Sequence, residues 1–78
     1  METIEARLKR VVSSVVAVDD DDFKPEASLV ENFNADSFDL VEIAMGIEDE
    51  FSIRIPPDDM TRLTTIRGVM DYIKSKVK

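Results

Sequence analysis

The first third of the chain carries apolar residues at the spacing of one helical face. These positions are Ile4, Leu8, Val11, Val12 and Val15. They predict a helix over about residues 3–17, with Thr3 as its N-cap. Four aspartates at 19–22 should end this helix, because like charges and poor helix propensity meet there. A long loop is then expected over roughly 18–35. Its apolar anchors are expected to be Phe23, Leu29, Val30 and Phe33.

A second helix, over about residues 36–51, has the clearest start signal. Asp36 is a good N-cap, and Asp39 three residues later resembles a capping box with aspartate in place of glutamate. Pro56 and Pro57 prevent the helix from continuing.

The rest of the chain predicts a short helical turn from Pro57 to Leu63 and a last helix over about 65–76, capped by Thr65. The apolar stripe of this last helix is Ile66, Val69, Met70, Ile73 and Val77. No segment shows the alternation of a strand. The sequence therefore predicts an all-α fold, a small bundle of three main helices plus one short helix, with residues 1–78 as a single domain.

When residues are placed around the helix axis at about 100° per position, the second helix has two apolar faces. The face expected in the core holds Leu40, Ile43, Ala44, Ile47 and Phe51. The opposite stripe holds Phe38, Val41 and Met45, flanked by Glu42 and Asp49. A bundle of 78 residues cannot easily bury both faces, so we expect the second stripe to be exposed and to dock onto a partner. The alternative is that the long loop folds over it.

The net charge and the amino-acid composition limit the classes of partner and the kinds of chemical site that the chain can have. Residues 19–59 hold fourteen acids and two bases, a net charge of −12, whereas the whole chain carries −7. Such a surface repels nucleic acid and anionic lipid and attracts basic protein surfaces. The alternative is that the negative charge serves solubility alone. The chain has no cysteine and no histidine, which excludes disulfides and the usual zinc sites. It has no apolar stretch of membrane-spanning length and no signal peptide, so we expect a cytoplasmic monomer without membrane insertion.

Ser37 stands at the first position of the second helix. A phosphate attached there would lie near free backbone N–H groups and the positive end of the helix dipole. Ser37 as a catalytic nucleophile would lack a histidine base, and Lys24 lies in a loop. An ordinary helix-start serine is the plain alternative.

The acidic run at residues 19–22 raises the possibility of a calcium-binding loop, because clustered carboxylates can bind divalent cations. A frame starting at Asp20 places Lys24 at a ligand position and Pro25 where glycine is needed for the turn. Both residues argue against such a loop, and no metal site is expected.

Residues 33–39, Phe-Asn-Ala-Asp-Ser-Phe-Asp, resemble the acyl carrier protein signature, which is usually leucine-glycine-any-Asp-Ser-Leu-Asp. The likeness continues along essentially the whole chain with matched lengths between elements. It includes Val41-Glu42, Glu48 to Phe51, Ile55-Pro56, Leu63 to Ile66 and Asp71 to Ile73.

This resemblance implies a non-catalytic carrier with an acyl-carrier-protein-like fold. Ser37, beside Asp36 of the motif, would bear 4′-phosphopantetheine, taken from coenzyme A by a phosphopantetheinyl transferase that uses magnesium. The thiol of that arm would carry acyl groups for fatty acid, lipid or polyketide-type synthesis. The second helix would dock onto basic patches of partner enzymes through Phe38, Asp39, Val41, Glu42, Met45 and Asp49. An acyl chain would fold back into a cavity lined by Leu40, Ile47, Ile55, Leu63 and Val69.

The sequence departs from the family pattern at three positions. Phe38 follows the serine in place of leucine, Asn34 stands where glycine is frequent, and Leu40 replaces a smaller or polar residue. The larger ring of Phe38 lies next to the modification site, where a change in volume alters packing with partners. It favours a specialised carrier over the general carrier of fatty acid synthesis.

Two other functions fit the same fold. An aminoacyl or peptidyl carrier is usually less acidic and carries a Gly-Gly-X-Ser motif in place of Asp-Ser. A carrier-like interaction subunit without cargo would not need Ser37.

Overall fold

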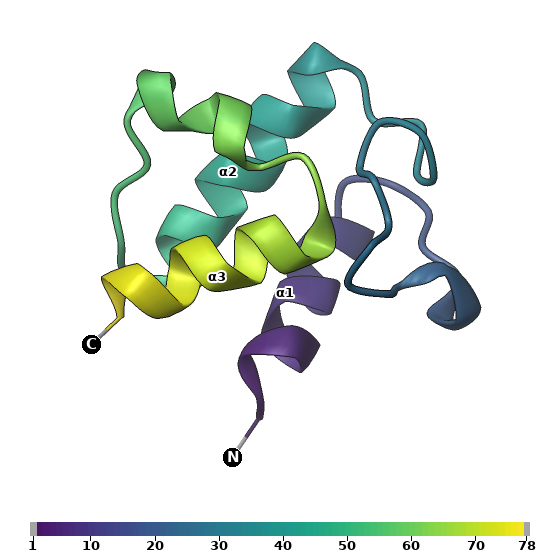
Figure 1. The fold of residues 1–78 in the computed structure, drawn as a ribbon, viewed down its shortest axis with the longest axis horizontal. Helices are drawn as coiled ribbons and strands as arrows, with labels where there is room; N and C mark the ends of the chain where they lie inside the picture. The colour runs from purple at the N-terminus through teal and green to yellow at the C-terminus, as the bar shows by residue number, and fades with distance from the viewer. Residues whose placement is uncertain (1, 78) are drawn as a thin grey trace.

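The structure, a computed structural model, describes residues 2–77. Three α-helices form the bundle, α1 (Ile4–Ser13), α2 (Ser37–Phe51) and α3 (Ile66–Lys76). Two short 3-10 helices, η1 (Asp20–Asp22) and η2 (Pro57–Arg62), interrupt the connections (Figure 1). Within the described residues the one β feature is an isolated bridge between Ser28 and Thr65. The predicted all-α fold is confirmed, with η1 as an additional turn in the acidic run.

Helix α1 begins as predicted and ends four residues earlier than predicted. The Thr3 side chain accepts a hydrogen bond from the Ala6 N–H at 3.1 Å. At the other end the Ser13 and Ser14 hydroxyls bond to carbonyls of the preceding turn, a local alternative to further helix. The expected end at residue 17 was wrong because valines, which are modest helix formers, follow these serines. Val15 and Val16 still pack against the core from the turn.

The long connection between α1 and α2 packs against the start of α3. The Leu29 N–H bonds to the Thr64 carbonyl at 3.0 Å, and the Ile66 N–H bonds to the Ala27 carbonyl at 3.0 Å. Three of the four expected anchors are buried: Phe23, Leu29 and Phe33. The fourth expectation was wrong, because Val30 is 51% exposed and points away from the core.

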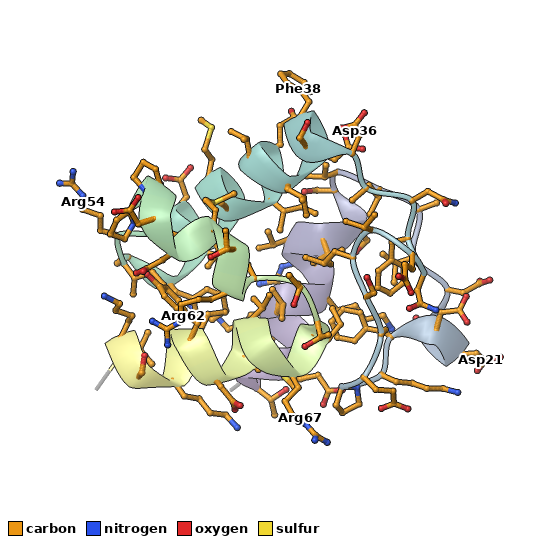
Figure 2. The ribbon with its side chains drawn as sticks, turned by 45° about the horizontal axis from the view of Figure 1, so that its top comes forward. Asp21, Asp36, Phe38, Arg54, Arg62 and Arg67 are labelled. Carbon is orange, nitrogen blue, oxygen red and sulfur yellow. The ribbon has the colours of Figure 1, made fainter. Side chains whose placement is uncertain are left out.

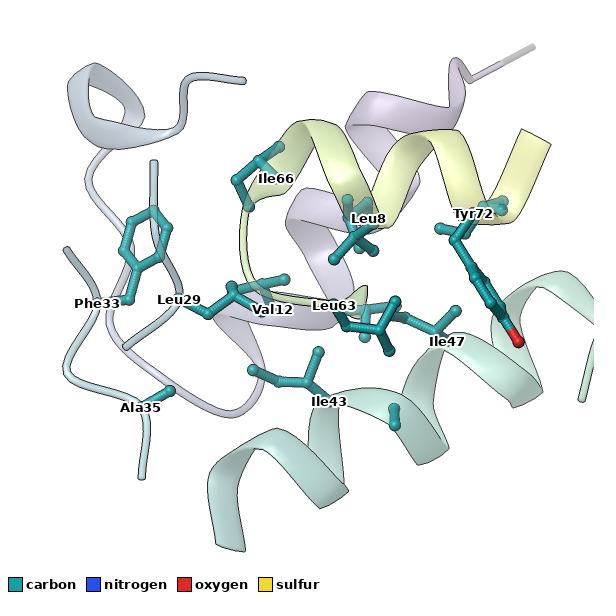
Figure 3. Packing of buried hydrophobic residues seen from close by; sticks show 14 of the residues in the cluster. Leu8, Val12, Leu29, Phe33, Ala35, Ile43, Ile47, Leu63, Ile66 and Tyr72 are labelled. Carbon is teal, nitrogen blue, oxygen red and sulfur yellow. The ribbon is translucent and has the colours of Figure 1, made fainter. Parts of the chain in front are cut away.

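The core lies between the three α-helices and this connection (Figure 3). Its largest fully buried side chains include Leu8, Leu29, Ile43, Ile47, Ile66 and Ile73. The core face predicted for α2 is confirmed for Ile43, Ala44, Ile47 and Phe51, with Leu40 only partly buried. In α3 the predicted stripe is buried at Ile66, Val69 and Ile73 and partly buried at Met70. Val77 was wrongly included, because it caps the helix and is 40% exposed.

None of the helices within residues 2–77 has the length and apolar character needed to cross a membrane.

Candidate functional site

The start of α2 is fixed by two reciprocal hydrogen bonds. The Asp36 carboxylate accepts from the Asp39 N–H at 2.8 Å, and the Asp39 carboxylate accepts from the Asp36 N–H at 3.3 Å. The predicted capping box is therefore confirmed. It places Ser37 at the first helical position, where its side chain is exposed. Figure 2 shows Asp36 and Phe38, the two neighbours of Ser37, at this end of the molecule.

The chain enters α2 through a turn that explains one departure from the family pattern. Asn34 has a φ of 56°, in the left-handed region that favours glycine and tolerates asparagine. On either side of it the side chains of Phe33 and Ala35 are buried. The Ala35 N–H also bonds to the Leu29 carbonyl at 3.0 Å. Asn34 therefore meets the backbone requirement that glycine meets elsewhere, and the approach to Ser37 is held by buried neighbours.

The second apolar stripe of α2 is exposed, as predicted. Phe38 is 69% exposed, Val41 49% and Met45 59%. The long connection does not cover this face, which removes the alternative that the loop buries it. Glu42 and Asp49 are exposed beside the stripe, whereas Asp39 is half-buried in the capping box. The docking role of these residues remains a prediction.

Other acids of α2 are engaged in holding the fold. The Arg7 Nε donates to Glu50 Oε2 at 2.8 Å, and Arg7 Nη2 donates to the Glu50 carbonyl at 2.6 Å. The Arg7 hydrogen bond lowers the pKa of Glu50 below its ordinary 4.5. Glu48 accepts a hydrogen bond from the Ile55 N–H at 2.7 Å. The acids of α2 that extend from the exposed apolar face into solvent are therefore Glu42 and Asp49.

An apolar groove runs beside Ser37 between α2 and η2. It has a volume of about 380 Å³ and is lined by Val30, Ser37, Leu40, Val41, Met60, Thr61, Leu63 and Thr64. A second groove of about 210 Å³ is lined by Val41, Ala44, Met45, Glu48, Ile55, Pro57 and Met60. Val41 and Met60 line both, so these two side chains separate one groove from the other.

The structure does not bring the five predicted acyl-cavity residues into one hollow. Leu40 and Leu63 line the groove beside Ser37, and Ile55 lines the second groove. Ile47 and Val69 line neither, because both are buried in the core, at 0% and 1% exposed.

Sequence reasoning missed four residues of the groove beside Ser37, namely Val30, Met60, Thr61 and Thr64. Val30 is predicted from sequence as an apolar anchor of the loop, and the other three have no predicted role. No sequence signal marks Val30, because residues 29–33 form turns, in which side chains do not alternate as they do in an extended chain.

Tyr72 of α3 connects this helix to η2. Its ring is 3% exposed, and its hydroxyl donates to Asp59 Oδ2 at 2.7 Å. Burial, and then the hydrogen bond to Asp59, raise the pKa of Tyr72 to about 12. The phenol is therefore a neutral hydrogen-bond donor at physiological pH.

The acidic run of the long connection forms the turn of η1, with Asp20 paired to Lys9 of α1. Among residues 2–77 no three acidic side chains gather in a way that could hold a metal ion.

Comparison with known proteins relates the chain to a sequence family and to a solved structure. The sequence model of a family described as a phosphopantetheine attachment site matches residues 6–73, a range that contains Ser37. The chain is also similar to a candidate acyl carrier protein from Anaplasma phagocytophilum, whose structure was solved in solution. The two are 30% identical, with 95% of this chain and 88% of that chain covered and a TM-score of 0.82.

Proposed function

The chain belongs to the phosphopantetheine-binding family of non-catalytic carriers, and from that premise we propose that it is an acyl carrier protein with Ser37 as its attachment residue. A phosphopantetheine attachment site is present in such a chain, and a phosphopantetheinyl transferase is implied as a partner. Residues 1–78 would act together as one carrier domain. We propose three further points: an acyl cargo, attachment at Ser37, and partner enzymes with basic surfaces.

The residues around Ser37 fit a phosphopantetheine group. The hydroxyl is exposed at the first position of α2, so a transferase can reach it. The Asp39 N–H already bonds to the Asp36 carboxylate, so the N–H groups of Ser37 and Phe38 are the ones that suit a phosphodiester, together with the positive end of the helix dipole. The Asp36 and Asp39 hydrogen bonds hold this turn before any group is attached. When bound, the group supplies a thiol that carries cargo as a thioester.

The apolar lining of the groove beside Ser37 is the observation that favours an acyl cargo. Its lining residues include no charged side chain. Burial of each methylene of an alkyl chain there is favourable by about 0.8 kcal/mol. A charged amino group would lose water without gaining a carboxylate partner. The groove therefore favours an acyl chain over the aminoacyl cargo of a peptidyl carrier.

The exposed face of α2 supports docking onto enzymes with basic patches. Phe38, Val41 and Met45 offer apolar contact, and Glu42 and Asp49 offer negative charge at its edge. Interfaces commonly combine an apolar centre with a polar rim. Phe38, as the bulkiest exposed residue next to Ser37, supports a partner dedicated to this carrier and a specialised route of fatty acid, lipid or polyketide-type synthesis.

The cargo can be tested by loading the chain from two coenzyme A thioesters with one transferase. Octanoyl-coenzyme A supplies an apolar chain, and 8-aminooctanoyl-coenzyme A supplies a chain of the same length with a charged amino end as the matched control. We expect the octanoyl chain to shift the methyl NMR signals of Leu40 and Leu63, and the 8-aminooctanoyl chain to leave them close to the unacylated carrier. Equal shifts with both cargos would contradict an acyl-specific groove.

A further inference from the structure

Tyr72 of α3 contacts two residues, Asp59 and Arg62, on one side of η2. Side chains three residues apart are eclipsed in a 3-10 helix, so Asp59 and Arg62 lie on the same side of η2. Asp59 accepts the Tyr72 hydrogen bond, and the Arg62 guanidinium lies over the Tyr72 ring, 5.4 Å from its centre. Figure 3 shows the Tyr72 side chain extending from α3 with its hydroxyl at the far end.

The residues between Asp59 and Arg62 form the wall of the groove. Met60 and Thr61 line the groove beside Ser37, and Met60 also lines the second groove. Met60 is therefore part of the partition between hollows of about 380 and 210 Å³. Any movement of η2 away from α3 would move this partition and change how far the apolar space continues.

Apart from Met60, which is partly buried and packs against the core, the other attachments of η2 are weak. None of its residues is fully buried, and its N-cap makes no side-chain hydrogen bond. The Asp59 N–H bonds to the Pro56 carbonyl and the Leu63 N–H to the Met60 carbonyl, with the poorer geometry of 3-10 turns. The buried Tyr72 side chain is thus the principal polar attachment of this segment to the core.

We propose that Tyr72 is a positioning residue that holds η2 through Asp59 and thereby sets the length of acyl chain that the groove beside Ser37 accepts. The proposal rests on the proposed function, since it concerns the cargo of that site. With the hydrogen bond in place, Met60 keeps the two grooves apart and the cargo is limited to the first. Without it, η2 can shift and the two grooves can join.

The test compares two variants that remove the hydrogen bond, Tyr72→Phe and Asp59→Ala, with Asp58→Ala, which removes an exposed carboxylate from the same turn without touching Tyr72. Each variant is loaded with butanoyl, octanoyl and dodecanoyl thioesters, and cleavage by hydroxylamine is followed. We expect Tyr72→Phe and Asp59→Ala to give their best protection at longer chains than the unaltered protein, and Asp58→Ala to keep the original profile. An identical length profile in all four proteins would overturn the proposal.

A second measurement needs no loading and so separates this proposal from the proposed function. The protection of backbone amides from hydrogen exchange in the unloaded chain should be about tenfold lower at position 59 and at Leu63 in Tyr72→Phe and Asp59→Ala, as expected for loss of one hydrogen bond to a charged group. Asp58→Ala should keep the protection of the unaltered chain at Leu63. Unchanged protection in both Tyr72→Phe and Asp59→Ala would overturn the anchoring role, whereas failure to load any thioester would overturn only the proposed function. Asp59→Ala carries the test alone should Tyr72→Phe fold poorly.

Discussion

Gly46 of α2 lies so close to Val11 of α1 that a Cβ at position 46 would stand 2.8 Å from Val11 Cγ1. Val11 is 8% exposed, and its branched side chain has few alternative rotamers. The glycine therefore allows the two helices to approach at this crossing, although glycine is a poor residue for the interior of a helix.

We predict that Gly46→Ala destabilises the protein by about 1 kcal/mol, because overpacking outweighs the gain in helix propensity. Urea unfolding of the variant gives the free energy. The same change in a Val11→Ala background has room for the new methyl group and should be stabilising there. A more stable Gly46→Ala single variant would contradict the close contact.

The Arg7–Glu50 pair predicts a pH dependence. Because Arg7 lowers the pKa of Glu50 below 4.5, the pair contributes stability above pH 4.5 and loses it as the pH falls through the lower folded-state pKa. Glu50→Gln should therefore melt below the unaltered protein at pH 7, and the difference should shrink at about pH 3. Asp49→Asn, a change of the exposed neighbour, should show no such convergence. Thermal unfolding at both pH values measures the effect, and a constant difference would contradict it.

Helix starts were predictable from sequence because their signals are local. Thr3, Asp36 and Thr65 each accept a hydrogen bond from an N–H three residues later. The end of α1 was not predictable from periodicity, because serine hydroxyls compete for its last carbonyls while the apolar spacing continues through Val15. The outward position of Val30 follows from turns within the loop, which periodicity does not describe.

The exposed stripe of α2 was predictable because one helix cannot place two opposite faces in a small core. The two grooves could not be predicted from sequence, because they depend on where η2 packs. Leu40 and Leu63 come from segments far apart in sequence and meet in one groove, whereas Ile47, on the same helix as Leu40, lies in the core.

The edge of the docking face can be tested by charge reversal. Glu42→Lys should slow modification by the transferase by about three- to tenfold at low ionic strength and weaken its salt dependence, because rim charges act mainly on association. Asp71→Lys reverses the charge of an exposed residue on α3 and should have little effect on the rate of modification. Initial rates at two salt concentrations measure both, with circular dichroism as the check on folding. Equal slowing by both variants would argue against a role specific to α2.

Phe38 provides the test for a specialised carrier. Phe38→Leu restores the usual family residue at an exposed position, so the fold should be unchanged. We predict better use by a general fatty acid synthesis enzyme and poorer use by the dedicated partner of this carrier, since shape matching at packed contacts differs. Steady-state kinetics with one enzyme of each kind measures the ratio of efficiencies. An unchanged ratio would make Phe38 a neutral substitution.

Intact mass after incubation with coenzyme A, magnesium and a phosphopantetheinyl transferase tests the attachment at Ser37 most directly. The unaltered chain should gain the mass of one 4′-phosphopantetheine group. Ser13→Ala, which removes an exposed serine from α1, should gain the same mass. Ser37→Ala should keep its helical spectrum, because the first helical position tolerates alanine, and should gain nothing. A mass gain that persists in Ser37→Ala would contradict attachment at this residue.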